Sequence, residues 1–355
     1  MNPACLVVIV VGLVMLAGQR AQAVPVPALR PLGPALEVSP PFAFDKKKTR
    51  RSASGIACAP ASAGAGAGQR CLVVFDEGTK AQFARLVAGR LQPFGTLIEL
   101  SDAAAEIDAE GAALAGGFYY VTGSHSVKRE SCKSNPASRV VIRFRATVPA
   151  ASPPRVEVSE RLSTTRLWDL MREDPYLRPH VDACLGNGEG GSPAQMQGRP
   201  GINIEGLAVA GGRLYAGFRG PSEGGLAPVF SVDAKALFEG GDAQPRLDRL
   251  DLGQRIGIRD MVAARNSILL LLGPDDHEAG VNAVWKVAEW KPGATAKPQV
   301  LAVLDVRKQD IGKACFEALK PEALAIVDES SKHFRVVVLS DGVCDGGPLI
   351  FDVSK

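Results

Sequence analysis

The sequence has 355 residues, of which 46% are hydrophobic and 22% are charged, and its formal net charge is +3. This length suits two average domains or one large all-β domain. A charge this small argues against nucleic acid as a partner.

An unbroken apolar run extends from Leu6 to Ala17 near the N-terminus. It has the length of a signal-peptide core and is short for a membrane span. Residues 21–23 read Ala-Gln-Ala, a small-residue cleavage site, so we predict a signal peptide over residues 1–23 and a periplasmic or secreted protein. The residues before the run include no Lys or Arg, which leaves a retained anchor as the alternative. We expect no membrane span after cleavage.

Residues 24–53 precede the first repeat and contain the basic cluster 46–51. We interpret this cluster as a solvated linker, with binding to an anionic surface as the alternative. The stretch 34–44, PALEVSPPFAF, is β-prone enough to be a strand that completes the fold described below.

Short β-prone segments separated by turn residues recur in groups of four from residue 54 to the end of the chain. The clearest group reads IEGLAVAGG, RLYAGFRG, APVFSVD and RLDRLDLG. Five groups are visible, and they predict an all-β fold, a β-propeller of four-stranded antiparallel blades over residues 54–355. A longer spacing between the second and third groups holds a helix and loop insertion at about 163–201. A sixth blade in that region is the alternative.

The fifth group ends after its third strand. An open ring would leave unpaired strand edges, so we predict that residues 34–44 supply the missing fourth strand from the N-terminal side.

The cysteines fit this arrangement of strands. Apart from Cys5 there are six, an even number that suggests disulfides in an exported chain. Cys58 and Cys71 flank the loop between the first two strands, and Cys315 and Cys344 stand at adjacent ends of two paired strands. Elimination leaves a third bridge. The predicted pairs are Cys58–Cys71, Cys315–Cys344 and Cys132–Cys184.

Six short motifs occur in a fixed order: FDEG, TGSHS, NIEGLA, FRGP, GIRDM and PEALA. In this order they resemble the bacterial family called domain of unknown function 3616, over about residues 54–353. Through the EGLA element the chain is also distantly similar to propellers named for esterase-like phytase activity. The resemblance implies a propeller but no reaction, because the closer family has no assigned activity.

In a propeller the first strand of each blade lines the channel. The start of that strand and the end of the next share one face, because the two strands are antiparallel. Charged or polar residues occupy these positions in every group, whereas the opposite strand ends carry mostly Ala, Gly and Val. The residues expected at this rim are Ser54, Asp76, Glu77, Glu110, Ser124, His125, Glu205, Arg219, Arg259, Asp260, Asp275, Asp276, His277, Glu322 and Asp341.

The residue types suggest three roles. Glu205, Asp260 and His125 are candidate catalytic acids or bases. The run Asp275, Asp276 and His277 could ligate a divalent cation such as calcium, or form a solvated turn. The candidate ligand-binding residues are Arg219, Arg259, Glu322, Glu110, Asp76 and Glu77. Hydrogen bonds between neighbouring blades are the structural alternative for each position.

Three functions follow from this rim. The first is a hydrolase, with or without a metal ion, that acts on a phosphoester or a lactone. The second is a non-catalytic envelope propeller that binds or scaffolds a small polar molecule or an envelope component. The third is a propeller in which calcium only stabilises the fold. We expect a monomer, and the sequence does not decide whether it is an enzyme.

Overall fold

The computed structural model describes residues 26–60, 68–102, 105–129, 131–148, 155–185, 200–276, 283–294, 297–312 and 315–355. The predicted signal peptide, residues 1–23, lies outside the described residues. Within the described part of the chain, no helix is long and apolar enough to cross a membrane.

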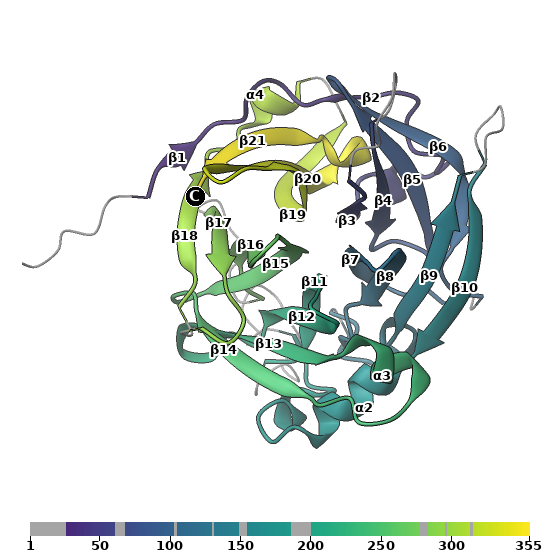
Figure 1. The fold of residues 1–355 in the computed structure, drawn as a ribbon, viewed down its shortest axis with the longest axis vertical. Coiled ribbons are helices and arrows are strands. Elements are labelled where there is room, and N and C mark those ends of the chain that lie inside the picture. The colour runs from purple at the N-terminus through teal and green to yellow at the C-terminus, as the bar shows by residue number, and fades with distance from the viewer. Residues whose placement is uncertain are drawn as a thin grey trace, which may run out of the picture.

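Five sheets stand around a central axis, as the blades of a propeller (Figure 1). Within each blade the strands pair antiparallel in chain order, with the first strand innermost. The first blade comprises β3 (Ala53–Cys58), β4 (Gln69–Phe75), β5 (Lys80–Val87) and β6 (Arg90–Glu99). The second comprises β7 (Ala109–Ala115), β8 (Phe118–Gly123), β9 (Val141–Thr147) and β10 (Glu157–Thr164).

The third blade comprises β11 (Asn203–Ala210), β12 (Arg213–Gly220), β13 (Leu226–Asp233) and β14 (Arg246–Asp251). The fourth comprises β15 (Ile256–Ala263), β16 (Ile268–Pro274), β17 (Trp285–Trp290) and β18 (Gln299–Leu304). The fifth comprises β19 (Phe316–Glu329), β20 (His333–Val343) and β21 (Leu349–Ser354). The prediction of a five-bladed propeller is confirmed.

Five apolar cores hold the ring together, one between each pair of neighbouring blades. Successive side chains of a strand point to opposite faces of its sheet, so one strand can serve two cores. In β4, Leu72 and Val74 pack toward the second blade, whereas Val73 and Phe75 pack toward the fifth. The polar face expected of a half-exposed sheet is therefore absent from these inner strands.

Glycines let the inner strands approach one another closely. Gly55, Gly111 and Gly206 are the glycines of the recurring first-strand motif. A Cβ on Gly111 would lie 2.7 Å from Leu207 Cβ, and one on Gly206 would lie 2.6 Å from Met261 Cγ. Distances this short exclude any side chain without a shift of the neighbouring strand. The acidic residues that directly precede the second and third of these glycines, Glu110 and Glu205, consequently lie on adjacent inner strands of neighbouring blades.

Residues 26–45 form what we call the N-terminal strap. Its strand β1 (Ala28–Leu29) pairs in parallel with β18 of the fourth blade, and β2 (Glu37–Val38) pairs in parallel with β6 of the first (Figure 1). Between them, the Leu32 N–H donates to the Ile350 carbonyl at 2.8 Å, beside the outer strand of the fifth blade. The strap thus bridges three blades.

This arrangement differs from the predicted fourth strand of the fifth blade. Among the described residues that blade has three strands, and residues 34–44 join its sheet only through single hydrogen bonds such as Leu36 N–H to the Pro348 carbonyl. Prolines at 34, 40 and 41 explain the difference, because proline has no N–H with which to extend a ladder.

The strap is anchored at its C-terminal end. Phe42 is 2% exposed and its ring lies 5.1 Å from that of Phe75, centroid to centroid. Its N–H donates to Asp345 Oδ1, which also accepts from Arg50 Nε at 2.8 Å. Arg50 belongs to α1 (Lys47–Arg50), so the basic cluster is helical in part; Lys46, Lys47 and Lys48 are exposed, whereas Arg50 is half-buried against the fifth blade.

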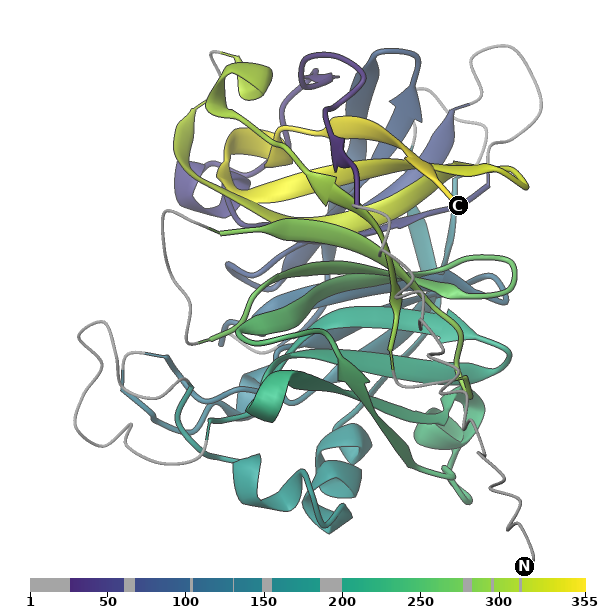
Figure 2. The same ribbon diagram turned by 90° about the vertical axis from the view of Figure 1, so that its left-hand side faces the viewer.

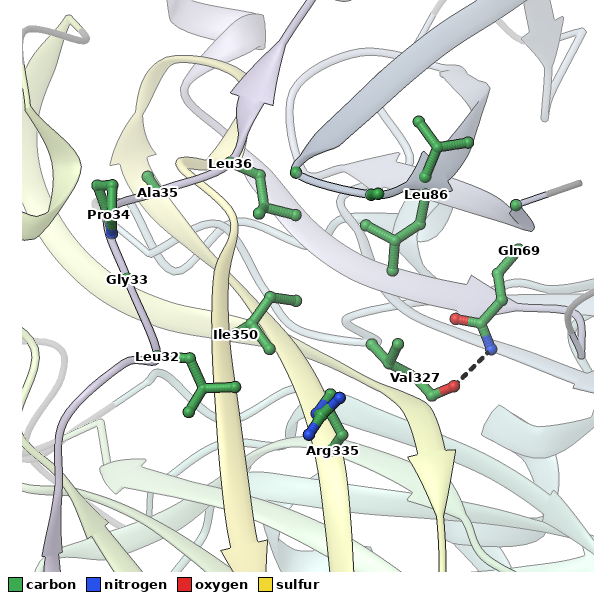
Figure 3. A pocket seen from close by; sticks show the side chains of 14 residues that line it. Leu32, Gly33, Pro34, Ala35, Leu36, Gln69, Leu86, Val327, Arg335 and Ile350 are labelled. Carbon is green, nitrogen blue, oxygen red and sulfur yellow. Dashed lines mark hydrogen bonds between the residues drawn. The ribbon is translucent and has the colours of Figure 1, made fainter. Parts of the chain in front are cut away.

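The strap also roofs a hollow of about 930 Å³ between the fifth and first blades, away from the channel (Figure 3). Most of its lining is apolar, including Leu36, Leu86 and Ile350. At its floor, Gln69 Nε2 donates to the Val327 carbonyl at 3.1 Å and links the first blade to the fifth.

The three predicted disulfides are confirmed: Cys58–Cys71, Cys132–Cys184 and Cys315–Cys344. The second of them ties the loop after β8 to the insertion, which contains α2 (Arg166–Glu173) and a short 3-10 turn (Arg178–His180). The insertion (teal) projects from one edge of the ring (Figure 2). Residues 186–199, which belong to the predicted insertion, lie outside the described residues. Two short helices, α3 (Ala234–Glu239) and α4 (Lys308–Ile311), follow β13 and β18.

Candidate functional site

A cavity of about 640 Å³ occupies one mouth of the channel. Its lining comes from the first, second, third and fifth blades and from α1. Eight acidic side chains line it: Asp76, Glu77, Glu106, Asp108, Glu110, Glu205, Glu322 and Asp341. Five basic side chains line it as well: Lys48, Lys128, Arg129, Arg219 and Lys320.

The other mouth of the channel has the opposite character. It holds a hollow of about 440 Å³ lined mostly by apolar residues, among them Ala57, Ala112, Leu207 and Met261. The asymmetry between the two ends of the inner strands, predicted from the sequence, is therefore present in the fold.

Arg259 on β15 lies behind the cavity and is 1% exposed. Its Nε is 2.9 Å from Glu205 Oε2, and its Nη2 pairs with Glu322 of the fifth blade. Burial and the nearby Arg219 lower the pKa of Arg259 to about 10, so the guanidinium remains charged at neutral pH. It joins the inner strands of three blades through two carboxylates.

Arg219 at the end of β12 is also held by two carboxylates. Its Nη1 is 3.0 Å from Glu205 Oε1, and its Nε is 3.2 Å from Asp276 Oδ1. Asn203 donates to both of these acids. Burial opposes the charge of Asp276, but Arg219 and Arg129 outweigh it and hold the pKa of this carboxyl below its ordinary value.

Asp260 does not line the cavity. Its side chain is fully buried, and it accepts from the backbone N–H of Met261 at 2.7 Å and of Leu324 at 2.6 Å. Burial raises the pKa of Asp260 well above its ordinary value, although these N–H groups oppose the shift. The carboxylate joins the fourth blade to the fifth, which matches the structural alternative given for this position.

His125 does not reach the cavity either. It is fully buried, and its ring stacks on that of Trp168 at 6.4 Å between centroids, with an angle of 26°. Arg139 covers the Trp168 ring, 4.1 Å from its centroid. Burial lowers the pKa of His125 to about 3, and the imidazole is therefore neutral at physiological pH. Here it packs the insertion against the second blade.

The predicted metal ligands are not gathered around one point. Asp275 accepts a hydrogen bond from Ser222 Oγ at 2.5 Å. Asp276 instead pairs with Arg219 and Arg129 and accepts a hydrogen bond from Asn203. His277 lies outside the described residues. Within the described part of the chain, no group of three or more His, Cys, Asp and Glu side chains is placed to hold a metal ion.

Four of the cavity carboxyls form what we call the acidic wall: Asp76, Glu106, Asp108 and Glu110. Burial raises the pKa of each above its ordinary value, and the neighbouring carboxylates add to the effect. For Asp76 and Glu110 the shift is large, with Asp341 and Asp108 respectively as the main neighbours. These carboxyls take up protons at a higher pH than free ones.

The partners of the acidic wall are mostly uncharged. Asp108 accepts from the hydroxyls of Ser124 and Ser126, and Glu106 accepts from the Gly78 N–H at 2.7 Å. Asp76 Oδ1 is buried and has no hydrogen-bond partner within the described structure.

The sequence of the chain matches one known protein family. The family described as a protein of unknown function (DUF3616) matches residues 77–148 and 141–345. The chain belongs to this family. No curated protein matches the sequence.

Solved structures similar to this DUF3616 chain share little sequence with it. One is a hypothetical protein from Leishmania major, with 11% identity, a TM-score of 0.42 and coverage of 93% of this chain and 91% of that one. A mannose phosphorylase from Leishmania mexicana has 11% identity, a TM-score of 0.41 and coverage of 93% and 88%. An endo-arabinanase from Bacillus licheniformis has 11% identity, a TM-score of 0.38 and coverage of 87% and 96%. Similarities this small carry no information about activity.

The structure brings many of the predicted rim residues of this DUF3616 chain into one cavity. Those that line it are Asp76, Glu77, Glu110, Glu205, Arg219, Glu322 and Asp341. Arg259 and Asp276 lie directly behind them as ion-pair partners, whereas Asp260, Asp275 and His125 are bonded or packed elsewhere.

Sequence reasoning missed several cavity residues. Asp108 was overlooked although it stands two residues before Glu110, because it precedes the strand in a left-handed conformation with φ of 53°. Lys48 reaches the cavity from α1, and Arg129 from the disulfide-tied loop after β8. An acid two residues before a first-strand motif is the one local signal that could have revealed Asp108.

Proposed function

We propose that this DUF3616 protein is an exported propeller that binds a small polar molecule in the channel-mouth cavity. The observation that carries the proposal is the convergence of charged side chains from four blades on one cavity. At about 640 Å³ the cavity falls within the size range of small-molecule sites. Three disulfides support export, because such bonds persist in oxidising compartments.

The ion pairs favour a neutral or cationic ligand over an anionic one. Arg219 and Arg259 are the cations that the sequence suggested for a phosphate or carboxylate group. Both already pair with Glu205, and each has a second carboxylate partner. An anion would have to displace these acids, so a phosphoester substrate loses support.

The test is to look for a ligand that the intact protein retains. Native mass spectrometry would compare the wild type with Ala105→Trp, which places a large side chain at an exposed position of the cavity lining. Ala294→Trp, at an exposed turn outside the cavity, is the matched control. We expect the wild type and the control to retain a small molecule from an envelope extract and Ala105→Trp to lose it. Equal retention by all three proteins would reject the cavity as the site.

A second candidate function is hydrolysis of an uncharged ester or lactone. Burial raises the pKa of Glu110 well above its ordinary value, so this carboxyl keeps its proton to a higher pH than a free one, and the ion-paired carboxylate of Glu205 lies near enough to add to that shift. Two carboxyl groups in unlike environments are a common acid–base arrangement. If a lactone or ester screen finds turnover, Glu110→Gln should lower kcat about 10²–10⁴-fold. Unchanged turnover in a folded Glu110→Gln variant would reject this role.

A further inference from the structure

We infer that the ligand of the cavity is a small organic cation that carries two or more amino groups, held by the acidic wall. The inference rests on the proposed function and names the chemical class of its ligand. It starts from how the charges in the cavity are paired.

Most cations of the cavity are already used. Lys48 pairs with Glu77, and Lys320 Nζ lies 2.8 Å from Asp341 Oδ2. Arg219 pairs with Glu205 and Asp276, and Arg129 also pairs with Asp276. Within the described part of the chain, no ion pair reaches the four carboxyls of the acidic wall. Against these four, the cavity lining offers only Lys128 as an unpaired cation among the described residues.

The hydrogen bonding of the acidic wall points to a missing donor. Asp76 lines the cavity, and its Oδ1 is buried without a hydrogen-bond partner among the described residues, although the Ser52 hydroxyl beside the carboxyl lowers its pKa. The Glu110 carboxyl, which also lines the cavity, likewise accepts no hydrogen bond from the described residues. Burying a carboxylate without a partner is costly. An ammonium group supplies both a positive charge and three N–H donors, and so meets both needs.

The spread of the carboxyls favours several amines over one metal ion. Calcium binds six to eight oxygens that converge at 2.3–2.6 Å. No group of three or more acidic, His or Cys side chains converges in this way among the described residues. The wall instead draws on two blades, with Asp76 after β4 and Glu110 on β7. Separate carboxyls around one volume match a molecule with separate ammonium groups.

Binding should release protons. Burial and neighbouring acids raise the pKa of Asp76 and of Glu110, so both carboxyls keep their protons to a higher pH than free carboxyls do. A cationic ligand selects the ionised form, so its affinity should increase as the pH rises through these raised pKa values. Asp76 and Glu110 also interact with each other, and the other charged groups that face them are Lys48, Glu77, Asp108, Glu205, Arg219, Arg259 and Asp341.

The experiment is calorimetric titration of the purified protein with spermidine. We expect wild type to bind, and Asp76→Asn and Glu110→Gln each to weaken binding about tenfold or more, because each removes one charge-assisted contact. Asp251→Asn, an exposed acid on the outer strand β14, is the matched control and should bind as wild type does. Titration in two buffers of different ionisation heat should reveal proton release, and the affinity should fall at high salt.

Three results would overturn the inference. The first is that the wild type shows no binding of spermidine. The second is that sorbitol binds as tightly as spermidine. The third is that calcium binds at the wall and spermidine does not. If the wild type and Ala294→Trp retain a small molecule that Ala105→Trp loses, any of these results rejects the amine class and leaves the proposed function intact. Equal retention by all three proteins, or no retention by the wild type, rejects the proposed function itself.

Discussion

Two sets of carboxyls share the channel mouth, and they differ in their partners. Glu205, Glu322 and Asp276 pair with arginines and connect neighbouring blades. The acidic wall, which belongs to the first and second blades, has no ion pair among the described residues, and the pKa of each of its members is raised. Pairing therefore separates acids that stabilise the fold from acids left available to a ligand.

The largest effect should come from breaking the paired set. Glu205→Gln removes the carboxylate shared by Arg219 and Arg259 and leaves each buried guanidinium with one carboxylate partner in place of two. We expect a loss of about 3–5 kcal/mol in the free energy of unfolding, measured by urea denaturation. A loss below about 1 kcal/mol would mean that the network does not hold the blades together.

The next effect concerns a buried group outside both sets. His125 has its pKa lowered to about 3, whereas in the unfolded chain it is near 6.5. Its neutral form stabilises the protein fully above pH 6.5, and this contribution falls by about 1.4 kcal/mol per pH unit as the pH decreases from 6.5 toward 3. In His125→Asn, the free energy of unfolding should vary less between pH 7 and pH 5. Asn suits the left-handed φ of 56° at this position.

Neutralising a carboxyl of the acidic wall should raise the free energy of unfolding, whereas breaking the paired set should lower it. Asp76→Asn removes a charge that has no partner, so it should stabilise the ligand-free protein by about 1 kcal/mol at pH 8. A carboxyl with a raised pKa is protonated at low pH, so the gain should fade as the pH falls through that raised value. Thermal unfolding at pH 8 and at pH 4 measures both points. Destabilisation at pH 8 would show that Asp76 belongs with the structural carboxyls.

The smallest effect is expected at the rim. The Lys48 side chain is 71% exposed, and its ion pair with Glu77 is open to solvent. Exposed pairs contribute little, so Lys48→Ala should change the free energy of unfolding by less than about 1 kcal/mol. A larger change in thermal unfolding would indicate that α1 is held to the ring through this pair.

The sequence predicted the part of the fold that repeats. Blade number, strand order and two of the disulfides followed from recurring strand and turn patterns, because those patterns are local, and the third disulfide followed by elimination. The closing segment was predicted in the wrong place, since its β-prone composition outweighed the prolines that prevent a full ladder. The Leu32 contact with Ile350 shows that the strap depends on tertiary neighbours, which no local pattern records.

The candidate site was predictable to the extent that strand register places side chains. Glu110, Glu205 and Glu322 occupy the same position in three blades, and all three line the cavity. Strand register did not reveal which way the Asp260 side chain points. Its carboxylate accepts a hydrogen bond from the Leu324 N–H of the next blade. Nor did register reveal Lys48, which reaches the cavity only because α1 packs beside the first blade.

The N-terminal strap has a consequence for the order of events during synthesis. Residues 28–32, among the earliest to be made, find their partners in β18 and β21, near the end of the chain. Until those strands have emerged, this part of the strap has no partner, and exposed strand edges favour association between chains. A chain that stalls before residue 350 should therefore leave the strap partly unpaired and be prone to aggregate.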